Sequence, residues 1–140
     1  YLLAWTTTPW TLPSNLALMV GKEIDYVRVR EPQSGKQYIL AKARLAHYFK
    51  EPVEELEQLK GSALEGVSYR PLFPFFAKWP KAFRVILEES VSLEDGTGIV
   101  HAAPAFGEVD FYACKREEID LVCPVDSNGR FTKEVPPYEG

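Results

Sequence analysis

The sequence predicts an α+β fold dominated by a small β-barrel with a few peripheral helices. Strand candidates are numerous and short, whereas helix candidates are few. Strands and helices also fail to alternate strictly, as they would in a parallel α/β protein. With 140 residues and a hydrophobic fraction of 46%, the chain has the size and composition of one packed domain. We therefore expect residues 1–140 to form a single domain.

The first strands are predicted by apolar runs and turn residues. Residues 1–4 indicate the end of an apolar strand, and residues 16–20 form a continuous apolar run that is followed by a turn at Gly21-Lys22. Residues 26–29 alternate between apolar and polar side chains. A turn at residues 32–35 connects them to a short strand at residues 37–40, so the two runs predict a β-hairpin.

Two helices are expected after the hairpin, at residues 41–48 and 53–59. Pro52 separates them and Gly61 ends the second. Their expected core contacts are Leu45, Leu56 and Leu59.

The next segment, residues 66–77, contains several aromatic side chains and two prolines. Prolines exclude it from the centre of a sheet, so we expect it to wrap the barrel or sheet as an edge segment. Residues 83–87 and 99–100 are strand candidates, the second starting after a glycine-rich turn at residues 95–98.

The last predicted helix covers residues 108–118, with one face formed by Val109, Tyr112 and Ala113. Beyond it, short strands containing Val122 and Phe131 flank the turn Asn128-Gly129.

Charge and cysteine content exclude several classes of function. A net charge of −4 argues against nucleic-acid affinity by this chain alone, so the phosphates of any RNA partner must be held elsewhere. No run reaches the roughly 18 apolar residues of a membrane span. Cys114 and Cys123 do not have zinc-site spacing, so we expect neither a metal nor a cofactor. They indicate a reducing cytoplasmic location, with a single disulfide as the alternative.

Residues 5–15 form an uncharged polar run with three adjacent threonines, two prolines and flanking indole rings. Threonine beside proline favours an extended backbone, whose successive side chains point to opposite faces. We therefore expect Thr6 and Thr8 to share one face and Thr7 to point away. Such a surface suits a small polar ligand held by hydrogen bonds, not a metal ion.

A second stretch rich in small residues covers residues 96–110. Glycine and alanine let the backbone approach a ligand closely, with His101 at a strand end and Asp110 near a helix start. Each feature also has a purely structural interpretation. Gly96 and Gly98 would form a turn, His101 would be a hydrogen-bonded core histidine, and Asp110 would face solvent.

Other catalytic arrangements are not supported. No serine lies in a GxSxG setting, and Cys114 falls inside a predicted helix, where a structural role is expected. Glu108 and Asp110 are two residues apart, so on a helix they point in different directions and do not form a glycosidase pair.

Taken together, WTTTPWTLPSN at residues 5–15 and GTGIVHAAPAFGEVD at residues 96–110 resemble the editing domain of isoleucyl-tRNA synthetase. The segments at residues 66–72 and 123–131 are also similar to that family. There the domain is the connective-peptide insertion in a class I Rossmann catalytic domain. Relatives that edit for valine and leucine carry arginine in place of the third threonine, so Thr8 favours the isoleucine branch. The HIGH and KMSKS signatures of the synthetic site are absent.

The resemblance implies post-transfer editing, with pre-transfer editing left open: hydrolysis of tRNA for isoleucine mischarged with valine, and of valyl-adenylate. The implied partners are the 3′ aminoacyl end of that tRNA, the valine moiety and the rest of the synthetase chain. The competing interpretation is a non-catalytic β-barrel module that binds tRNA or protein.

Two residue roles in the second stretch follow from the resemblance. Asp110 would bind the α-ammonium group of the substrate, and a charge-assisted hydrogen bond suits that contact. His101 would line the side-chain pocket and exclude isoleucine by its bulk. Hydrolysis would then proceed by direct attack of an ordered water. In the alternative mechanism His101 is a general base oriented by Asp110, a role that competes with ammonium binding.

The first stretch supplies the remaining implied contacts. Thr6, Thr7 and Thr8 would position the ester or anhydride, the ribose hydroxyls and the water. Asn15 matches a position tied to editing in the family. Trp10 either forms a wall of the pocket or packs in the core.

Overall fold

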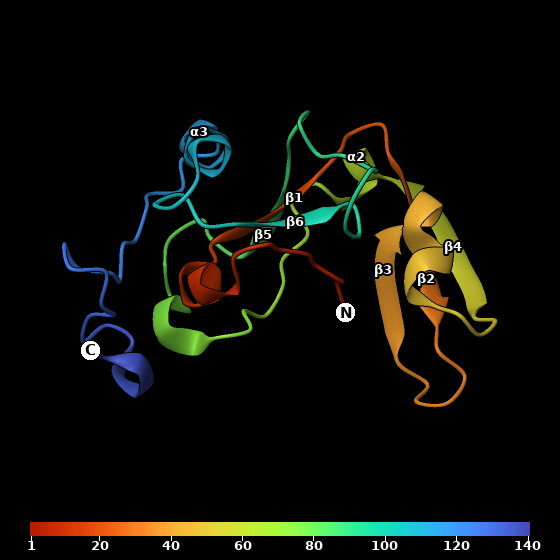
Figure 1. The fold of residues 1–140 in the computed structure, drawn as a ribbon. Coiled ribbons are helices and arrows are strands. Elements are labelled where there is room, and N and C mark those ends of the chain that lie inside the picture. Colours follow the sequence, from red (N-terminus) through yellow and green to blue (C-terminus); the bar gives the residue numbers. More distant parts are fainter.

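The computed structural model describes all residues from 1 to 140, arranged around two three-stranded sheets (Figure 1). The central sheet has the order β5-β1-β6. Its middle strand β1 (Ala17–Val20) pairs in parallel with β5 (Arg84–Leu87) and antiparallel with β6 (Ile99–Ala102). All four residues of β1 are buried, as expected for a strand that is covered on both faces.

The second sheet is antiparallel and has the order β3-β2-β4. It consists of β2 (Asp25–Arg30), β3 (Gln37–Ala41) and β4 (Glu54–Lys60). The hairpin of β2 and β3 confirms the expectation from residues 26–40.

The α+β class is confirmed, but the expected closed barrel is wrong, because the two sheets remain separate. The N-terminal segment, residues 1–5, connects them through only a few backbone hydrogen bonds. Leu3 N–H donates to the Ile39 carbonyl of β3 at 3.0 Å, and Trp5 N–H donates to the Ile99 carbonyl of β6 at 2.9 Å. The segment contacts β3 first and β6 next. It therefore does not form a full strand in either sheet, and no strand closes a barrel.

The predicted helix at residues 53–59 is also wrong, because these residues lie largely in β4. The register between β2 and β4 shifts at Arg28 and Val29, which leaves Leu56 as an extra residue in β4. A bulged strand can therefore half-bury both Leu56 and Leu59 although they are three residues apart. On the exposed side Arg28 pairs with Glu57 at 3.2 Å.

The helices are short except for α3, and none combines the length and apolar character that a membrane crossing requires. The expected helix at residues 41–48 is present as a 3₁₀ turn continued by one α-helical turn. The expected helix at residues 108–118 is α3. Its buried residues are Ala113 and Cys114, whereas Val109 and Tyr112 are exposed, so the predicted face was partly wrong. The helical bounds are η1 Pro9–Ser14, η2 Lys42–Arg44, α1 Leu45–Tyr48, α2 Gly61–Leu64, η3 Pro74–Phe76, α3 Glu108–Arg116 and η4 Pro136–Tyr138.

The segment at residues 66–77 runs along the outer edge of β5, as its prolines predict. Ser68 pairs with Arg84 in a single bridge, and Tyr69 N–H donates to the Phe83 carbonyl at 2.9 Å. The two short strands expected near Val122 and Phe131 are reduced to isolated bridges of Phe131.

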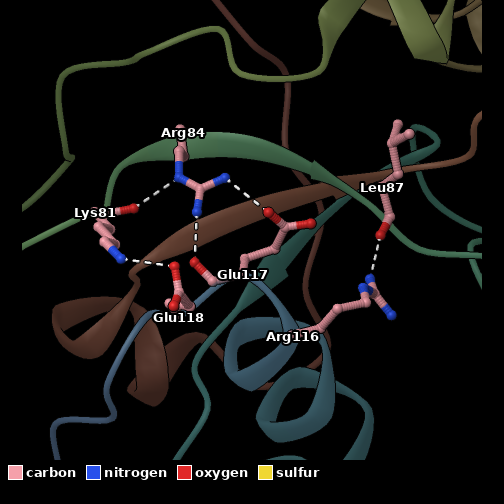
Figure 2. Close-up of polar contacts among 6 residues, drawn as sticks. All are labelled: Lys81, Arg84, Leu87, Arg116, Glu117 and Glu118. Atoms are coloured by element: carbon pink, nitrogen blue, oxygen red, sulfur yellow. Dashed lines mark hydrogen bonds and ion pairs between the residues drawn. The ribbon is translucent and has the colours of Figure 1, made fainter.

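Ion pairs and hydrogen bonds connect the C-terminal end of α3 to β5 and to the residues just before it (Figure 2). Arg84 of β5 lies 3.1 Å from the Glu117 carboxylate and also donates to the Glu117 carbonyl at 2.7 Å. Lys81 pairs with Glu118 at 2.7 Å, and Arg116 donates to the last carbonyl of β5. The Lys81 ammonium holds the pKa of the exposed Glu118 carboxyl below its usual range. These contacts fix α3, and with it Asp110, against the central sheet.

Candidate functional site

A cavity of about 900 Å³ opens beside the central sheet. Leu18 and His101 both line it, and because they pair directly between β1 and β6, they lie on the same sheet face. The walls come from residues 1–6 and 67–72 together with Ile39 of β3. The lining is mostly apolar, with a few polar groups that include His101, as in small-molecule sites.

The His101 imidazole is buried, with 5% of its surface exposed, and both ring nitrogens are hydrogen-bonded. Nε2 lies 2.8 Å from Thr11 Oγ1 and Nδ1 lies 2.7 Å from Asn15 Nδ2. The Asn15 amide nitrogen can only donate, so Nδ1 accepts and Nε2 carries the proton. Burial lowers the pKa of His101 to about 4, which leaves the ring neutral at pH 7.

The threonine run is connected to this imidazole through Thr11. Thr11 Oγ1 donates to the Thr8 carbonyl at 2.8 Å, so it accepts from His101 Nε2–H. Thr8 N–H donates to Thr6 Oγ1 at 3.1 Å, and the hydroxyls of Thr6 and Thr8 lie 3.4 Å apart, so these two side chains share one face as predicted. Thr7 is exposed.

The predicted extended backbone does not continue beyond Thr8, because η1 begins at Pro9. Proline has a φ angle that suits the first position of a helix, and its missing N–H would be unpaired there in any case. In a 3₁₀ turn, residues three positions apart lie on the same side, so Thr11 lies on the same side of the turn as Thr8.

Thr11 and Tyr69 are the two residues of this arrangement that the sequence analysis missed. Thr11 carries a usable signal, its spacing of three from Thr8 after a proline. The Tyr69 hydroxyl donates to Asn15 Oδ1, a contact between residues 54 positions apart for which no local pattern exists. The Tyr69 ring stacks edge-on against Phe83 at 6.0 Å.

Asp110 lies in the first turn of α3, close to the end of β6 but outside the cavity lining. Its Oδ2 accepts a hydrogen bond from Ala103 N–H at 3.0 Å, two residues beyond His101. Burial raises the pKa of the Asp110 carboxyl, although this hydrogen bond opposes the shift. The structure therefore joins Asp110 to the His101 strand, but it gives no hydrogen bond between Asp110 and the threonine run.

Trp10 also lies outside the cavity lining. Its side chain is 51% exposed and packs edge-on against the Phe106 ring at 5.0 Å, so packing in the buried core is excluded.

The glycine-rich turn before β6 has a structural role. Gly96 and Gly98 both have positive φ angles, of 70° and 79°, which glycine adopts without steric cost. A side chain at Gly96 would come within 2.7 Å of the Trp5 ring, so this glycine also lets Trp5 pack against the turn. Arg44 donates to the Gly96 carbonyl at 2.8 Å and holds the same turn from the other side.

Comparison with known proteins places these features in a family. Over its whole length the chain is 56% identical to isoleucine–tRNA ligase of Protochlamydia amoebophila, and over 99% of its length it is 54% identical to isoleucine–tRNA ligase of Bdellovibrio bacteriovorus. The chain belongs to the isoleucine–tRNA ligase family. It spans only 14% of the length of these two relatives. No family model matches the chain.

Solved structures with a similar fold are leucyl-tRNA synthetase editing domains. The P. falciparum cytosolic editing domain has a TM-score of 0.68 and 14% identity, and the comparison covers 91% of this chain and 56% of that one. GlLeuRS-CP1 has a TM-score of 0.66 and 21% identity, with 86% of this chain and 50% of that chain covered. This piece of the isoleucine–tRNA ligase family therefore has the fold of an editing domain.

Proposed function

We propose that this chain is the editing domain of an isoleucine–tRNA ligase, inserted in the longer synthetase, and that it hydrolyses valine esterified to the tRNA for isoleucine. Valyl-adenylate is a second proposed substrate. The observation that carries the proposal is the cavity lined by Thr6 and Asn15 from the threonine-rich run and by His101 from β6.

The need for such an activity follows from the small difference between the two amino acids. One methylene in a hydrophobic pocket is worth about 1–3 kcal/mol, a general value for which this synthetase family is itself the standard example. A synthetic site alone therefore attaches valine to the tRNA for isoleucine at an appreciable rate. A second site that admits valine but excludes isoleucine removes the error.

The size of the cavity fits a ligand larger than an amino acid. Volumes of about 300–1,000 Å³ accommodate drug-sized molecules, and this cavity measures about 900 Å³. A terminal aminoacyl-adenosine is of that size, whereas valine alone would leave most of the space unfilled. Exclusion of isoleucine must then act locally, near the point where the side chain is bound.

The state of His101 favours a steric role over a role as general base. Its Nδ1 already accepts from Asn15, its Nε2–H is donated to Thr11, and its pKa is lowered to about 4 by burial. No lone pair remains for a water proton. A ring held at both nitrogens is a rigid wall, and forcing an extra methylene against a rigid wall costs about 1–3 kcal/mol.

Hydrolysis then proceeds by direct attack of water on the aminoacyl carbonyl. The water oxygen bonds to the carbonyl carbon, the ester C–O bond breaks, and the departing ribose hydroxyl gains the proton that water loses. The hydroxyls of Thr6, which lines the cavity, and of Thr7 and Thr8, which lie outside the lining, are proposed to position water and ribose. Hydrogen-bond donors near the carbonyl would stabilise the developing negative charge. No covalent enzyme intermediate is needed, because the ester is already activated.

Asp110 lies outside the cavity lining but is joined to the His101 strand, and it is proposed to bind the α-ammonium group. One carboxylate oxygen is engaged by Ala103 N–H, and burial raises its pKa, so a cation beside it would recover the lost solvation. Trp10, exposed beside Phe106, is proposed to form an outer wall for the tRNA end.

The test is deacylation of valyl-tRNA for isoleucine by the 140-residue chain, measured for wild type, Asp110→Ala and the control Glu108→Ala. Glu108 is an exposed carboxylate in the same helical turn. Loss of a charge-assisted hydrogen bond should lower kcat/KM about 10- to 100-fold in Asp110→Ala and leave the control unchanged. Equal rates for all three proteins would remove Asp110 from the mechanism. Binding of the tRNA without deacylation would favour a non-catalytic module.

The variant His101→Ala distinguishes a steric role of His101 from a role as general base. The readout is the ratio of isoleucyl-tRNA to valyl-tRNA hydrolysis, which partial unfolding does not alter. If His101 acts as a steric wall, this ratio should rise while hydrolysis of valyl-tRNA persists. A general base predicts that both rates vanish together.

A further inference from the structure

A continuous chain of hydrogen bonds runs from the wall of the cavity to the threonine run. Tyr69 donates to the amide oxygen of Asn15, Asn15 donates to His101 Nδ1, and His101 Nε2–H donates to Thr11. Thr11 in turn donates to the Thr8 carbonyl. Every hydrogen bond in this series has one donor and one acceptor. The orientation of the Asn15 amide therefore determines which group donates at each step of the series.

The Asn15 amide is oriented at both ends. Its nitrogen faces the Ala17 carbonyl at 2.8 Å as well as His101 Nδ1, and its oxygen faces the Tyr69 hydroxyl. Tyr69 is the only donor that the structure gives to this oxygen. Without it, the oxygen would be half-buried and unpaired, which removes part of the preference for this orientation of the amide. The hydrogen bond from the Asn15 nitrogen to the Ala17 carbonyl remains and still opposes the reverse orientation.

The tautomer of His101 decides where the Thr11 hydroxyl points. When Nε2 carries the proton, Thr11 accepts from His101 and its own hydrogen is free to bind the Thr8 carbonyl. When Nδ1 carries the proton, Nε2 becomes an acceptor and competes with that carbonyl for the single Thr11 hydrogen. In the second state the hydrogen bond from Thr11 to the Thr8 carbonyl is therefore lost, and the threonine run is no longer held at that point.

We propose that Tyr69 is a positioning residue, which acts through Asn15 to hold His101 in the Nε2–H tautomer and thereby anchors the Thr8 backbone through Thr11. The ring of Tyr69 is itself fixed by its edge-on contact with Phe83 at 6.0 Å. The consequence for ester hydrolysis rests on the proposed editing function, but the tautomer does not.

The direct test is ¹⁵N–¹H NMR of the histidine side chains at pH 7. The chain has only two histidines, and the exposed His47 serves as an internal reference for the buried His101. Wild type should show a protonated Nε2 and an unprotonated Nδ1. Tyr69→Phe removes one neutral hydrogen bond, which should raise the ratio of the Nδ1–H to the Nε2–H tautomer about fivefold. The control Tyr112→Phe removes the hydroxyl of an exposed tyrosine and should change nothing.

A wild-type spectrum with the proton on Nδ1 would overturn the proposal without any variant. So would a Tyr69→Phe spectrum that is indistinguishable from wild type at His101. A change in His101 signals equal in Tyr112→Phe and Tyr69→Phe would also overturn it, because the effect would not depend on the Asn15 contact.

Deacylation of valyl-tRNA by the same proteins tests the functional consequence. In Tyr69→Phe, kcat should fall in proportion to the fraction of molecules that change to the Nδ1–H tautomer, with little change in KM, since the cavity wall retains its shape. If the tautomer shifts but kcat does not, the link from Tyr69 to the reacting groups is refuted. If wild type has no activity while the tautomer still shifts, the editing function fails and the positioning of His101 stands.

Discussion

Acidification should destabilise this protein through His101. The neutral imidazole is held between Asn15 and Thr11, and burial lowers its pKa to about 4 in the folded state. In the unfolded chain the ring is exposed to water, where a histidine pKa is about 6.5. Between these values the unfolded state binds a proton that the folded state rejects.

The sign and size of the effect follow from this difference. Stability rises with pH wherever the unfolded state binds more protons, so the contribution of His101 is complete above about pH 6.5 and is lost as the pH falls toward 4. A difference of about 2.5 pKa units corresponds to about 3 kcal/mol in total. At pH 5 about 2 kcal/mol of this should already be lost.

Urea unfolding at pH 7 and pH 5 measures the loss, and His101→Gln isolates it. Glutamine cannot titrate, so the free energy of unfolding of this variant should lack the part of the pH dependence that His101 supplies. The comparison with wild type is needed because Asp110 acts in the opposite direction. Burial raises the pKa of its carboxyl, which favours the folded state as the pH falls. His47→Gln, which removes the exposed imidazole, should retain the wild-type slope.

If wild type and His101→Gln lose the same free energy between pH 7 and pH 5, His101 does not carry the effect. The reasoning would then be refuted at its first step, because the ring would have to be charged or solvated in the folded protein.

Two further predictions concern the scaffold. Gly96→Ala places a methyl group against the Trp5 ring at a φ of 70° and should lower the free energy of unfolding by about 1–3 kcal/mol. Gly129→Ala has a similar φ of 77° but open space around it, so a cost as large as that of Gly96→Ala would show that the contact with Trp5 does not matter. Arg84→Met removes the ion pair with the half-buried Glu117 and should cost about 1–2 kcal/mol, measured by urea unfolding at low and high salt. A cost below about 0.3 kcal/mol would mean that the Arg84–Glu117 ion pair contributes little to holding α3.

The local elements were largely predictable because their signals are local. The apolar run at residues 16–20 forms the buried β1, and turn residues between alternating runs produce the hairpin of β2 and β3. The helical composition after Gly107 produces α3. The helix-forming residues at 53–59 misled the prediction, because pairing with β2 outweighs the intrinsic helix preference of this segment.

The candidate site was predictable in its residue types but not in its contacts. The threonines, Asn15, His101 and Asp110 could be named in advance because they fall in two short stretches, one of adjacent threonines and one rich in glycine and alanine. Their arrangement was not visible. Tyr69 reaches Asn15 across 54 residues, and Thr11 reaches His101 across 90.

Sequence patterns were enough to predict the α+β class, most of the strands, the resemblance to an editing domain and a set of candidate site residues. Only the tertiary structure decided that the sheets stay open, that Asp110 is joined to the His101 strand and lies outside the cavity lining, and that His101 is neutral with a defined tautomer. The physical reason is that backbone period and turn chemistry are properties of neighbouring residues. Burial, protonation and the pairing of sheet edges depend on groups that the folded chain brings together from distant positions.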